Sequence, residues 1–312
     1  MKTMTLGTTG VEVSALCLGA MYFGTRNDQA TSFALADQYV EAGGSFIDTA
    51  NIYAHWIPGG KGGESETVLG QWMKARSNRD QLFLASKVGF GYPGVEKCLK
   101  PDVIITECEK SLKRLGVETI DLYYAHVDDR ETALDETLLA FDKLVKDGKV
   151  RYIGASNYAA WRLEQSLWFS EISKLASFVA VQQRYTYARP NYNANFGAQL
   201  VANQELIDCC QANNLTLLAY SVLLGGAYVR EGEFDAGYRG PDSDARLVVL
   251  KEVAQETNAT VNQVVLAWML HSDPPVLPLT AASTKERLQE NLGSLNVSLS
   301  AEQMQRLNAA GV

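Results

Sequence analysis

The chain has 312 residues, of which 46% are hydrophobic and 21% are charged, proportions typical of a globular protein with a large core. Its formal net charge of −8 argues against nucleic acid as a main partner. The first residues lack the apolar segment of a signal peptide, and no uncharged apolar stretch reaches the roughly 20 residues that span a bilayer, so we expect a cytoplasmic protein without a membrane partner.

The first predicted element is a short hairpin over residues 4–13, with its turn at Gly7 to Gly10. Short apolar runs then alternate with amphipathic segments of helical length. We predict buried strands near residues 16–20, 45–49, 82–87, 120–126, 150–155, 178–182, 215–220 and 276–280. Helices are predicted at residues 31–42, 102–115, 132–147 and 199–212.

The segment between the last two predicted strands is too long for a single helix. We expect a glycine-rich polar loop at 224–243, a helix from about 244 and a second helix at 261–271, with a last helix at 300–310. The repeated strand–helix alternation predicts one domain over residues 1–312, an α/β fold of the closed (β/α)8 TIM-barrel type with an N-terminal β-hairpin and two extra helices. A doubly wound open sheet is the alternative, although no G-x-G-x-x-G motif follows the first strand.

Titratable residues stand at the carboxyl ends of the predicted strands, where parallel barrels keep their chemistry. Asp48, Lys87 and His126 each end a strand, and Tyr53 follows Asp48 closely. An ammonium from Lys87 would lower the pKa of the Tyr53 phenol, and Asp48 would keep that ammonium charged. A neutral His126 would orient a carbonyl oxygen beside the phenol. The alternatives without a catalytic role are a buried ion pair of Asp48 with Lys87 and a core position for His126.

The same residues belong to a longer pattern. It comprises the segment Phe46-Ile47-Asp48-Thr49-Ala50-Asn51-Ile52-Tyr53 and, in order, Gly63-Glu64-Ser65-Glu66, Ser86-Lys87-Val88, His126, Gly154-Ala155-Ser156-Asn157 and Ala219-Tyr220-Ser221. With this pattern the chain resembles the aldo-keto reductase family, of the bacterial type with a short C-terminal loop. The resemblance implies an oxidoreductase that transfers hydride between a nicotinamide cofactor and an aldehyde, ketone or sugar carbonyl, with Tyr53 as general acid and base.

The resemblance also implies a cofactor site. Ser156, Asn157 and Gln182 would hydrogen-bond the nicotinamide carboxamide, and Tyr220 would stack on the ring. The further cofactor positions are Gly19, Met21, Ser221, Leu223, Gly225, Ser283, Arg287, Glu290 and Asn291. Helix N-caps for Ser156 or Asn157 and core packing for Tyr220 are the structural alternatives.

The choice of cofactor depends on the segment after the last strand. The usual glycine and basic residue of the family are replaced by Ala281 and by Ser283-Thr284, so that Arg287 is left to hold a 2′-phosphate. The resemblance therefore favours NADP(H), while NAD(H) stays possible and a solvated Arg287 is the alternative.

Aromatic residues near the same barrel face are candidates for an open substrate pocket that takes a small carbonyl compound or a sugar; these are Tyr22, Phe23, His55, Trp56 and Tyr92. Two other functions stay open: a Schiff-base lyase that uses Lys87, and a nicotinamide-binding regulatory subunit with negligible turnover. The cysteines are odd in number and lack metal-ligand spacing, so we expect reduced thiols and no metal. The sequence is compatible with a monomer or a homo-oligomer.

Overall fold

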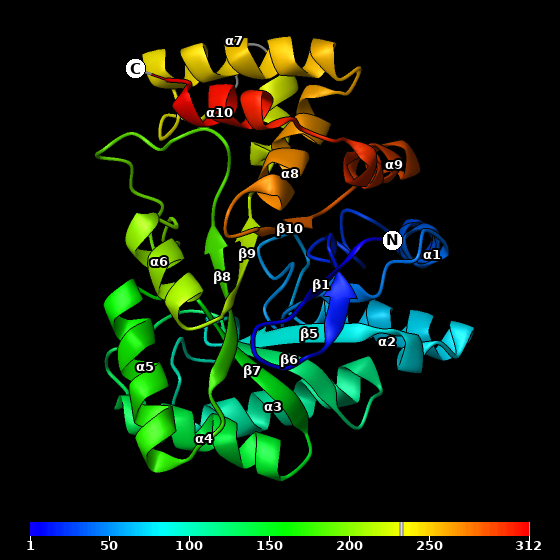
Figure 1. Cartoon of the computed structure of the whole chain (residues 1–312). Coiled ribbons are helices and arrows are strands. Elements are labelled where there is room, and N and C mark those ends of the chain that lie inside the picture. Colours follow the sequence, from blue (N-terminus) through cyan, green and yellow to red (C-terminus); the bar gives the residue numbers. More distant parts are fainter. Residues whose placement is uncertain (231, 233, 312) are drawn as a thin grey trace.

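Parallel strands close into a barrel in the computed structural model, which describes residues 1–230, 232 and 234–311 (Figure 1). Neighbouring strands follow the order β10-β3-β4-β5-β6-β7-β8-β9, and β10 pairs with both β3 and β9. The barrel strands are β3 (Cys17–Gly19), β4 (Phe46–Asp48), β5 (Phe83–Val88), β6 (Ile120–Ala125), β7 (Val150–Ser156), β8 (Phe178–Arg184), β9 (Thr216–Tyr220) and β10 (Leu277–Thr280). The predicted closed (β/α)8 barrel is confirmed, and the open doubly wound sheet is wrong because no edge strand remains in this sheet.

Helices surround the barrel in chain order (Figure 1). They are α1 (Gln29–Glu41), α2 (Glu64–Arg76), α3 (Pro101–Leu115), α4 (Leu134–Lys146), α5 (Ala160–Ser173), α6 (Gln204–Ala212), α7 (Pro241–Glu256), α8 (Val261–His271), α9 (Lys285–Gly293) and α10 (Ala301–Ala309). Short 3-10 helices are η1 (Arg79–Gln81), η2 (Leu224–Val229) and η3 (Ser294–Asn296). The expected two extra helices are α7 and α10, which contact each other at the top of Figure 1.

Several predicted boundaries moved. The helix expected at 199–212 begins only at Gln204, because the Asn203 side chain caps it by accepting from the backbone N–H of Leu206. The polar loop expected at 224–243 contains η2 and ends where α7 begins at Pro241. Residues 231 and 233 of that predicted loop lie outside the described residues.

Two helices, α2 and α5, were not placed by the sequence pattern. In α5, Trp161 and Trp168 are 58% and 59% exposed, so large apolar residues occur on its outer face as well as its inner face. This distribution hides the helical period on which the prediction depends.

The N-terminal hairpin closes the amino-terminal end of the barrel. It is formed by antiparallel β1 (Thr3–Thr5) and β2 (Glu12–Ser14). Leu6 is fully buried in the cluster that fills this end of the barrel. Gly7 has φ +48° and donates its backbone N–H to Thr216 Oγ1 at 2.7 Å, and a Cβ at Gly7 would lie 2.3 Å from the Val179 carbonyl oxygen. The predicted site residues lie at the opposite end of the barrel, where the strands have their carboxyl ends.

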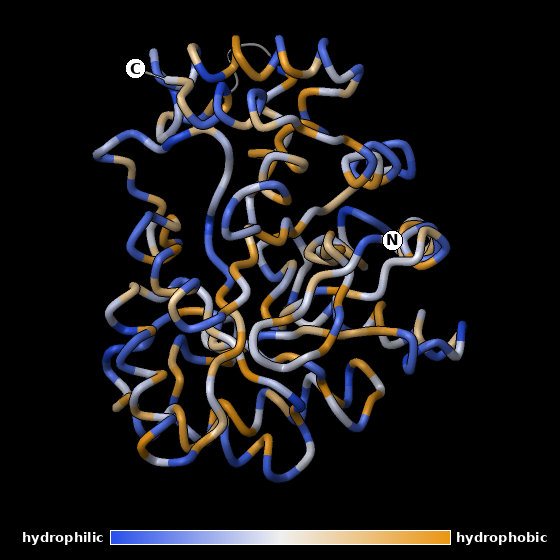
Figure 2. The backbone as a smooth tube through the Cα atoms, viewed as in Figure 1, coloured by the Kyte–Doolittle hydropathy of each residue, from blue (hydrophilic) through white to orange (hydrophobic). Residues whose placement is uncertain are grey.

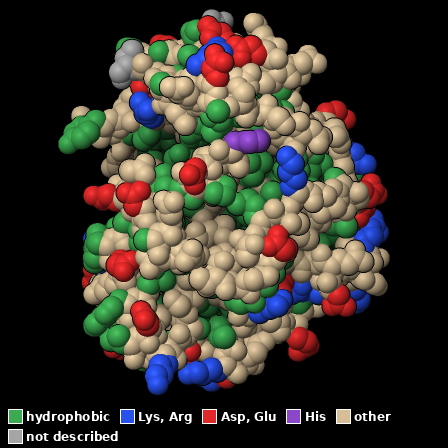
Figure 3. All heavy atoms as spheres, in the orientation of Figure 1, with side chains coloured by type: hydrophobic (Ala, Val, Ile, Leu, Met, Phe, Trp, Pro, Cys, Tyr) green, Lys and Arg blue, Asp and Glu red, His purple; other side chains and the backbone are tan. Residues whose placement is uncertain are grey.

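Burial along the strands follows the expectation for a sheet covered on both faces. Every residue of β5 and β6 is buried, and Figure 2 shows hydrophobic colour concentrated on the strands, with mixed colour on the helices. On the face in Figure 3, hydrophobic side chains gather in the middle, whereas charged ones lie mainly toward the edge. None of the described helices is long and apolar enough to cross a membrane.

Candidate active site

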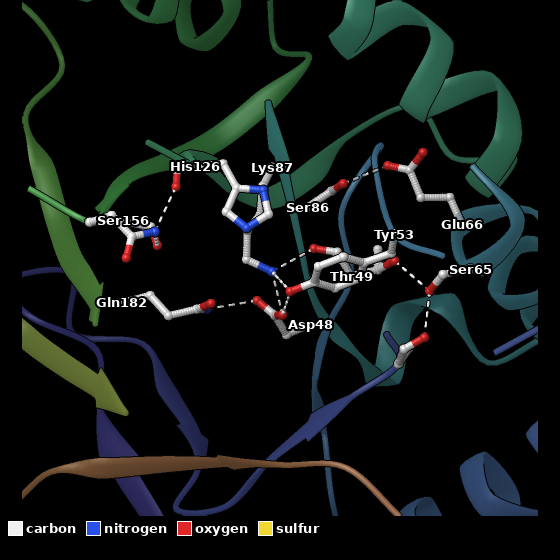
Figure 4. Close-up of polar contacts among 12 residues, drawn as sticks. Asp48, Thr49, Tyr53, Ser65, Glu66, Ser86, Lys87, His126, Ser156 and Gln182 are labelled. Carbon is white, nitrogen blue, oxygen red and sulfur yellow. Dashed lines mark hydrogen bonds and ion pairs between the residues drawn. The ribbon is translucent and has the colours of Figure 1, made fainter. Parts of the chain in front are cut away.

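Neighbouring barrel strands bring together the four predicted catalytic residues Asp48, Tyr53, Lys87 and His126, called the tetrad below. Asp48 is the last residue of β4, Lys87 lies near the end of β5, and His126 follows the last residue of β6. The register places Asp48 beside Ala85 on the next strand, two residues before Lys87. Tyr53 lies in the turn after β4, and Figure 4 shows its hydroxyl directed toward Lys87 and Asp48.

Lys87 is the centre of this cluster. Its fully buried ammonium donates to Asp48 Oδ1, to the Thr49 carbonyl oxygen at 2.8 Å and to Tyr53 Oη at 2.8 Å. These acceptors use all the donors that a lysine ammonium has. The second carboxylate oxygen of Asp48 accepts from Gln182 Nε2 at 2.9 Å. The geometry therefore favours the charged ion pair.

The pKa of Tyr53 is raised well above its ordinary value of 10, first by burial and then by the Asp48 carboxylate. This direction is opposite to the one expected from the sequence. Burial costs the phenolate more than the nearby ammonium returns, and Asp48 repels the same negative charge. Tyr53 consequently stays protonated at neutral pH, which suits a proton donor.

The ion pair is held against a large desolvation cost. Burial raises the pKa of the Asp48 carboxyl and lowers the pKa of the Lys87 amine, while each charge opposes the shift of the other. Either charge alone would be unstable here, so the two residues act as one unit.

His126 completes the cluster as a neutral imidazole. Burial, and secondarily the Lys87 charge, hold its pKa well below 6.5. Its ring centroid lies 5.8 Å from that of Tyr53 and 4.8 Å from that of Phe90. Its Nδ1 is buried and has no hydrogen-bond partner among the described residues. Phe90 was not predicted, although its position soon after Lys87 at the same strand end is a signal for it.

The low pKa of His126 predicts a pH-dependent contribution to stability. The unfolded chain takes up a proton on this histidine near pH 6.5, whereas the native protein does not. The contribution is therefore complete above that pH and is lost as pH falls, by up to about 1.4 kcal/mol per pH unit. His126→Gln should flatten the decline of unfolding free energy between about pH 6 and pH 5 in urea titrations. Parallel declines in both proteins would contradict this prediction.

The residues expected around a nicotinamide ring surround the same cluster. Asn157 has φ +58°, and its side chain donates from Nδ2 to the His126 carbonyl oxygen at 2.9 Å. Its Oδ1 accepts from the Tyr220 hydroxyl at 2.6 Å. The N-cap alternative for Ser156 and Asn157 is wrong, because α5 begins after Ala159 and has no side-chain cap. Asn157 thus links three strand ends within the protein.

The loop after β9 contains several residues with positive φ. Ser221, Leu224, Gly225 and Gly226 have φ values of 58°, 47°, 65° and 94°. The backbone N–H groups of Leu224 and Gly226 donate to the carbonyl oxygens of Ser221 and Leu223, at 3.1 Å and 2.8 Å. A Cβ at Gly225 would meet no atom within 4 Å, so space is open there. Leu223, also predicted as a cofactor position, lies within this loop.

The segment after β10 has a cation and hydroxyls at a helix start. Arg287 Nη1 donates to Ser283 Oγ at 2.8 Å, and Thr284 caps α9. This donor set suits a phosphate. Glu290 instead accepts from Thr260 and Asn262, at 2.7 Å and 3.3 Å, and the predicted Asn291 is buried. The cofactor-binding role expected of both residues stays a prediction.

The other predicted positions near the first strand differ in exposure. Gly19 pairs with Asp48, and a Cβ there would lie 2.8 Å from Leu279, so close strand packing explains this glycine. Met21 packs against the small cluster that contains Tyr53. Phe23, predicted for the substrate pocket, is only 2% exposed and belongs to the main core. That prediction needs correction, because the ring is occupied with core packing.

The remaining aromatic candidates lie around the carboxyl end. The Trp56 ring is 45% exposed and stands edge-on to Tyr53 at 6.3 Å and to His55 at 5.2 Å. The guanidinium of Arg26 lies 4.5 Å from the Tyr22 ring centroid. Tyr92 Oη donates to Glu107 at 2.6 Å, so its hydroxyl is already committed.

This arrangement of a buried lysine–aspartate pair, a protonated tyrosine and a neutral histidine can be compared with known proteins. The sequence pattern described as the aldo/keto reductase family matches residues 15–311. The chain belongs to this family. The chain is 33% identical to norsolorinic acid reductase stcV of Emericella nidulans, over 95% of this chain and 77% of that protein. It is 31% identical to the uncharacterized oxidoreductase YrpG of Bacillus subtilis, over 97% and 94%, and 28% identical to an aryl-alcohol dehydrogenase [NADP(+)] of Phanerodontia chrysosporium, over 96% and 83%.

Family membership and the names of these relatives support an enzyme, specifically an oxidoreductase that acts on carbonyl groups. They also confirm the family that the sequence resembles. The cofactor preference and the roles of individual residues go beyond these comparisons.

Proposed function

We propose that the protein is an NADP(H)-dependent reductase of aldehydes and ketones in which Tyr53 is the general acid. The observation that carries the proposal is the Tyr53 hydroxyl, which is held 2.8 Å from the buried Lys87 ammonium, with the His126 ring centroid 5.8 Å from that of Tyr53. A bound nicotinamide would supply or accept the hydride at the carbonyl carbon.

Residues of the protein donate the proton to the substrate carbonyl oxygen and orient that oxygen. Tyr53 donates its proton to the carbonyl oxygen, and the Lys87 ammonium beside Tyr53 Oη stabilises the negative charge left on the phenol. His126 is neutral and donates a hydrogen bond to the same oxygen, which orients the substrate. Asp48 keeps Lys87 charged and in place.

The direct test is consumption of NADPH with a panel of aryl aldehydes, aliphatic aldehydes and sugars. The name of one relative, an aryl-alcohol dehydrogenase, points to aryl substrates. The aromatic surroundings of Tyr53, with Trp56 and Phe90 edge-on to the tetrad, suit a flat ring. We therefore expect the highest kcat/KM with aryl carbonyls. Absence of turnover across the panel, with tight NADPH binding, would instead support the regulatory subunit.

Cofactor choice should depend on Arg287, whose guanidinium lies beside Ser283 at the start of α9. A charge-assisted contact with a 2′-phosphate is worth about 1.5–3 kcal/mol, or roughly tenfold to hundredfold in affinity. Arg287→Ala should weaken NADPH binding by that factor and leave NADH binding nearly unchanged, as measured by quenching of tryptophan fluorescence. Equal losses for both cofactors would show that Arg287 only supports the helix, and no loss would place the phosphate elsewhere or favour NAD(H).

The Schiff-base alternative has less support. A nucleophilic lysine must lose its proton, whereas Lys87 donates to Asp48, Thr49 and Tyr53 at once. Borohydride trapping with a carbonyl substrate would label Lys87 if this alternative were correct.

A further inference from the structure

A buried carboxylate behind the tetrad has no part in the chemistry described above. Glu107 of α3 is 1% exposed. Its Oε2 accepts from Asn51 Nδ2 at 2.9 Å and from Tyr92 Oη at 2.6 Å, and its Oε1 accepts from Lys110 Nζ at 2.7 Å. These bonds lower the pKa of Glu107, so the carboxylate is ionised at neutral pH.

The two donors to Oε2 come from different loops, Asn51 from the segment after β4 and Tyr92 from the segment after β5. Asn51 is two residues before Tyr53, and its backbone N–H donates to the Lys87 carbonyl oxygen at 3.3 Å. Tyr92 is two residues after Phe90, whose ring is in contact with His126. One carboxylate oxygen therefore joins the segment that carries the proton donor to the loop that faces the substrate.

A second buried carboxylate supports the same region. Glu66 of α2 accepts from Ser86 Oγ at 2.5 Å, next to Lys87, and from Arg114 Nε at 2.6 Å (Figure 4 shows the Ser86 contact). Arg114 lies against Gly63, where a Cβ would stand 2.6 Å from its Cδ. The Gly63–Glu66 segment singled out in the sequence thus has a physical role, since it seats Arg114 between α2 and α3.

Tyr92 is held by its ring as well as by its hydroxyl. Gly62 has φ +90°, and a Cβ at this position would lie 2.8 Å from Tyr92 Cδ2. The Tyr92 ring also packs against the cluster of Ala50, Ile52 and Tyr53, as do Met21 and Phe90. Loss of the bond between Tyr92 and Glu107 would loosen this loop without removing its apolar contacts.

We propose that Glu107 is a positioning residue that sets the distance between Tyr53 and the substrate-facing loop, through Asn51 on one side and Tyr92 on the other. The inference rests on the proposed function, because that function assigns proton donation to Tyr53, which Asn51 supports, and substrate binding to the loop that contains Tyr92. Small displacements of a proton donor lower the rate of the chemical step, whereas a loosened loop weakens substrate binding. The two bonds of Glu107 should therefore affect different kinetic parameters.

The test compares the single-turnover rate of NADPH oxidation, and KM for an aryl aldehyde, in four variants. Asn51→Ala should lower the rate roughly tenfold with little change in KM, and Tyr92→Phe should raise KM roughly tenfold with little change in rate, as expected for one lost hydrogen bond to a charged group. Glu107→Gln should show both effects. Lys149→Met is the matched control and should show neither, because its ion pair with Glu109 on the same helix α3 is exposed to solvent and is worth little.

Thermal unfolding and NADPH affinity are measured for each variant, and Asn51→Ser replaces Asn51→Ala if the latter does not fold. Lower melting temperatures with unchanged rate and KM, or the same kinetic change in the Asn51 and Tyr92 variants, would reduce Glu107 to a structural residue and overturn the inference. A wild-type protein without turnover on any carbonyl would overturn the proposed function and this inference together. If the wild type turns over normally, the proposed function stands and the variants test the role of Glu107 alone.

Discussion

Tyr53→Phe should lower the turnover number for carbonyl reduction by about 10²–10⁴-fold, the range for loss of a general acid. The variant removes only the hydroxyl that Lys87 contacts at 2.8 Å and keeps the ring, which packs in the small aromatic cluster. NADPH affinity should change little, whereas the free energy of unfolding should fall by about 1–3 kcal/mol, because one donor of the buried Lys87 ammonium loses its acceptor. Steady-state consumption of NADPH gives the turnover number, fluorescence titration gives the cofactor affinity, and urea unfolding gives the stability.

Tyr192→Phe provides a control for this experiment, because Tyr192 is fully exposed and its hydroxyl has no role in the site. Its turnover should equal that of the wild type. Full activity of Tyr53→Phe would show that another group donates the proton. In that case His126 would be the first candidate, and the role proposed for Tyr53 would be wrong.

The second large effect concerns stability. Lys87→Met should lower the free energy of unfolding by about 3–5 kcal/mol, because the fully buried Asp48 carboxylate then lacks its counter-charge. The double variant Asp48→Asn with Lys87→Met should recover most of this loss, since no buried charge remains and the amide still accepts from Gln182. Both proteins should be nearly inactive. Urea unfolding at pH 7 gives the free energies, and NADPH consumption gives the activity.

Additive losses in the double variant would contradict this interpretation. Two independent contacts would each cost stability, whereas a coupled ion pair costs most when one charge is left alone. The comparison therefore tests whether Asp48 and Lys87 form one unit, separately from the question of which residue donates the proton.

The structure also places Gln182, a predicted cofactor residue, next to this ion pair. The Gln182 amide donates to Asp48 Oδ2, so that its own carbonyl oxygen is the group left for a nicotinamide carboxamide. The orientation of Gln182 would follow from the charge on Asp48. No sequence pattern indicated this contact, because the two residues are 134 positions apart.

Local features of the chain were enough to predict the barrel, and together with the family pattern they predicted the four residues of the tetrad. Short apolar runs that end in Asp48, Lys87 and His126 need only a buried strand and a polar terminus to be recognised, and the closed barrel then brings those termini together. Helix boundaries were less certain where a cap decided the start, as at Asn203, and where an outer face is apolar, as in α5.

The sequence by itself determined which residues stand at the carboxyl ends of the strands, since strand ends and periodicity are properties of neighbouring residues. Tertiary structure alone decided their charge states and their contacts. The pKa of Tyr53 rises because burial from several strands removes water from the phenol, an effect that no local pattern encodes. Phe23 is buried and Glu107 joins two loops for the same reason: each depends on elements far away in the chain that meet only when the barrel closes.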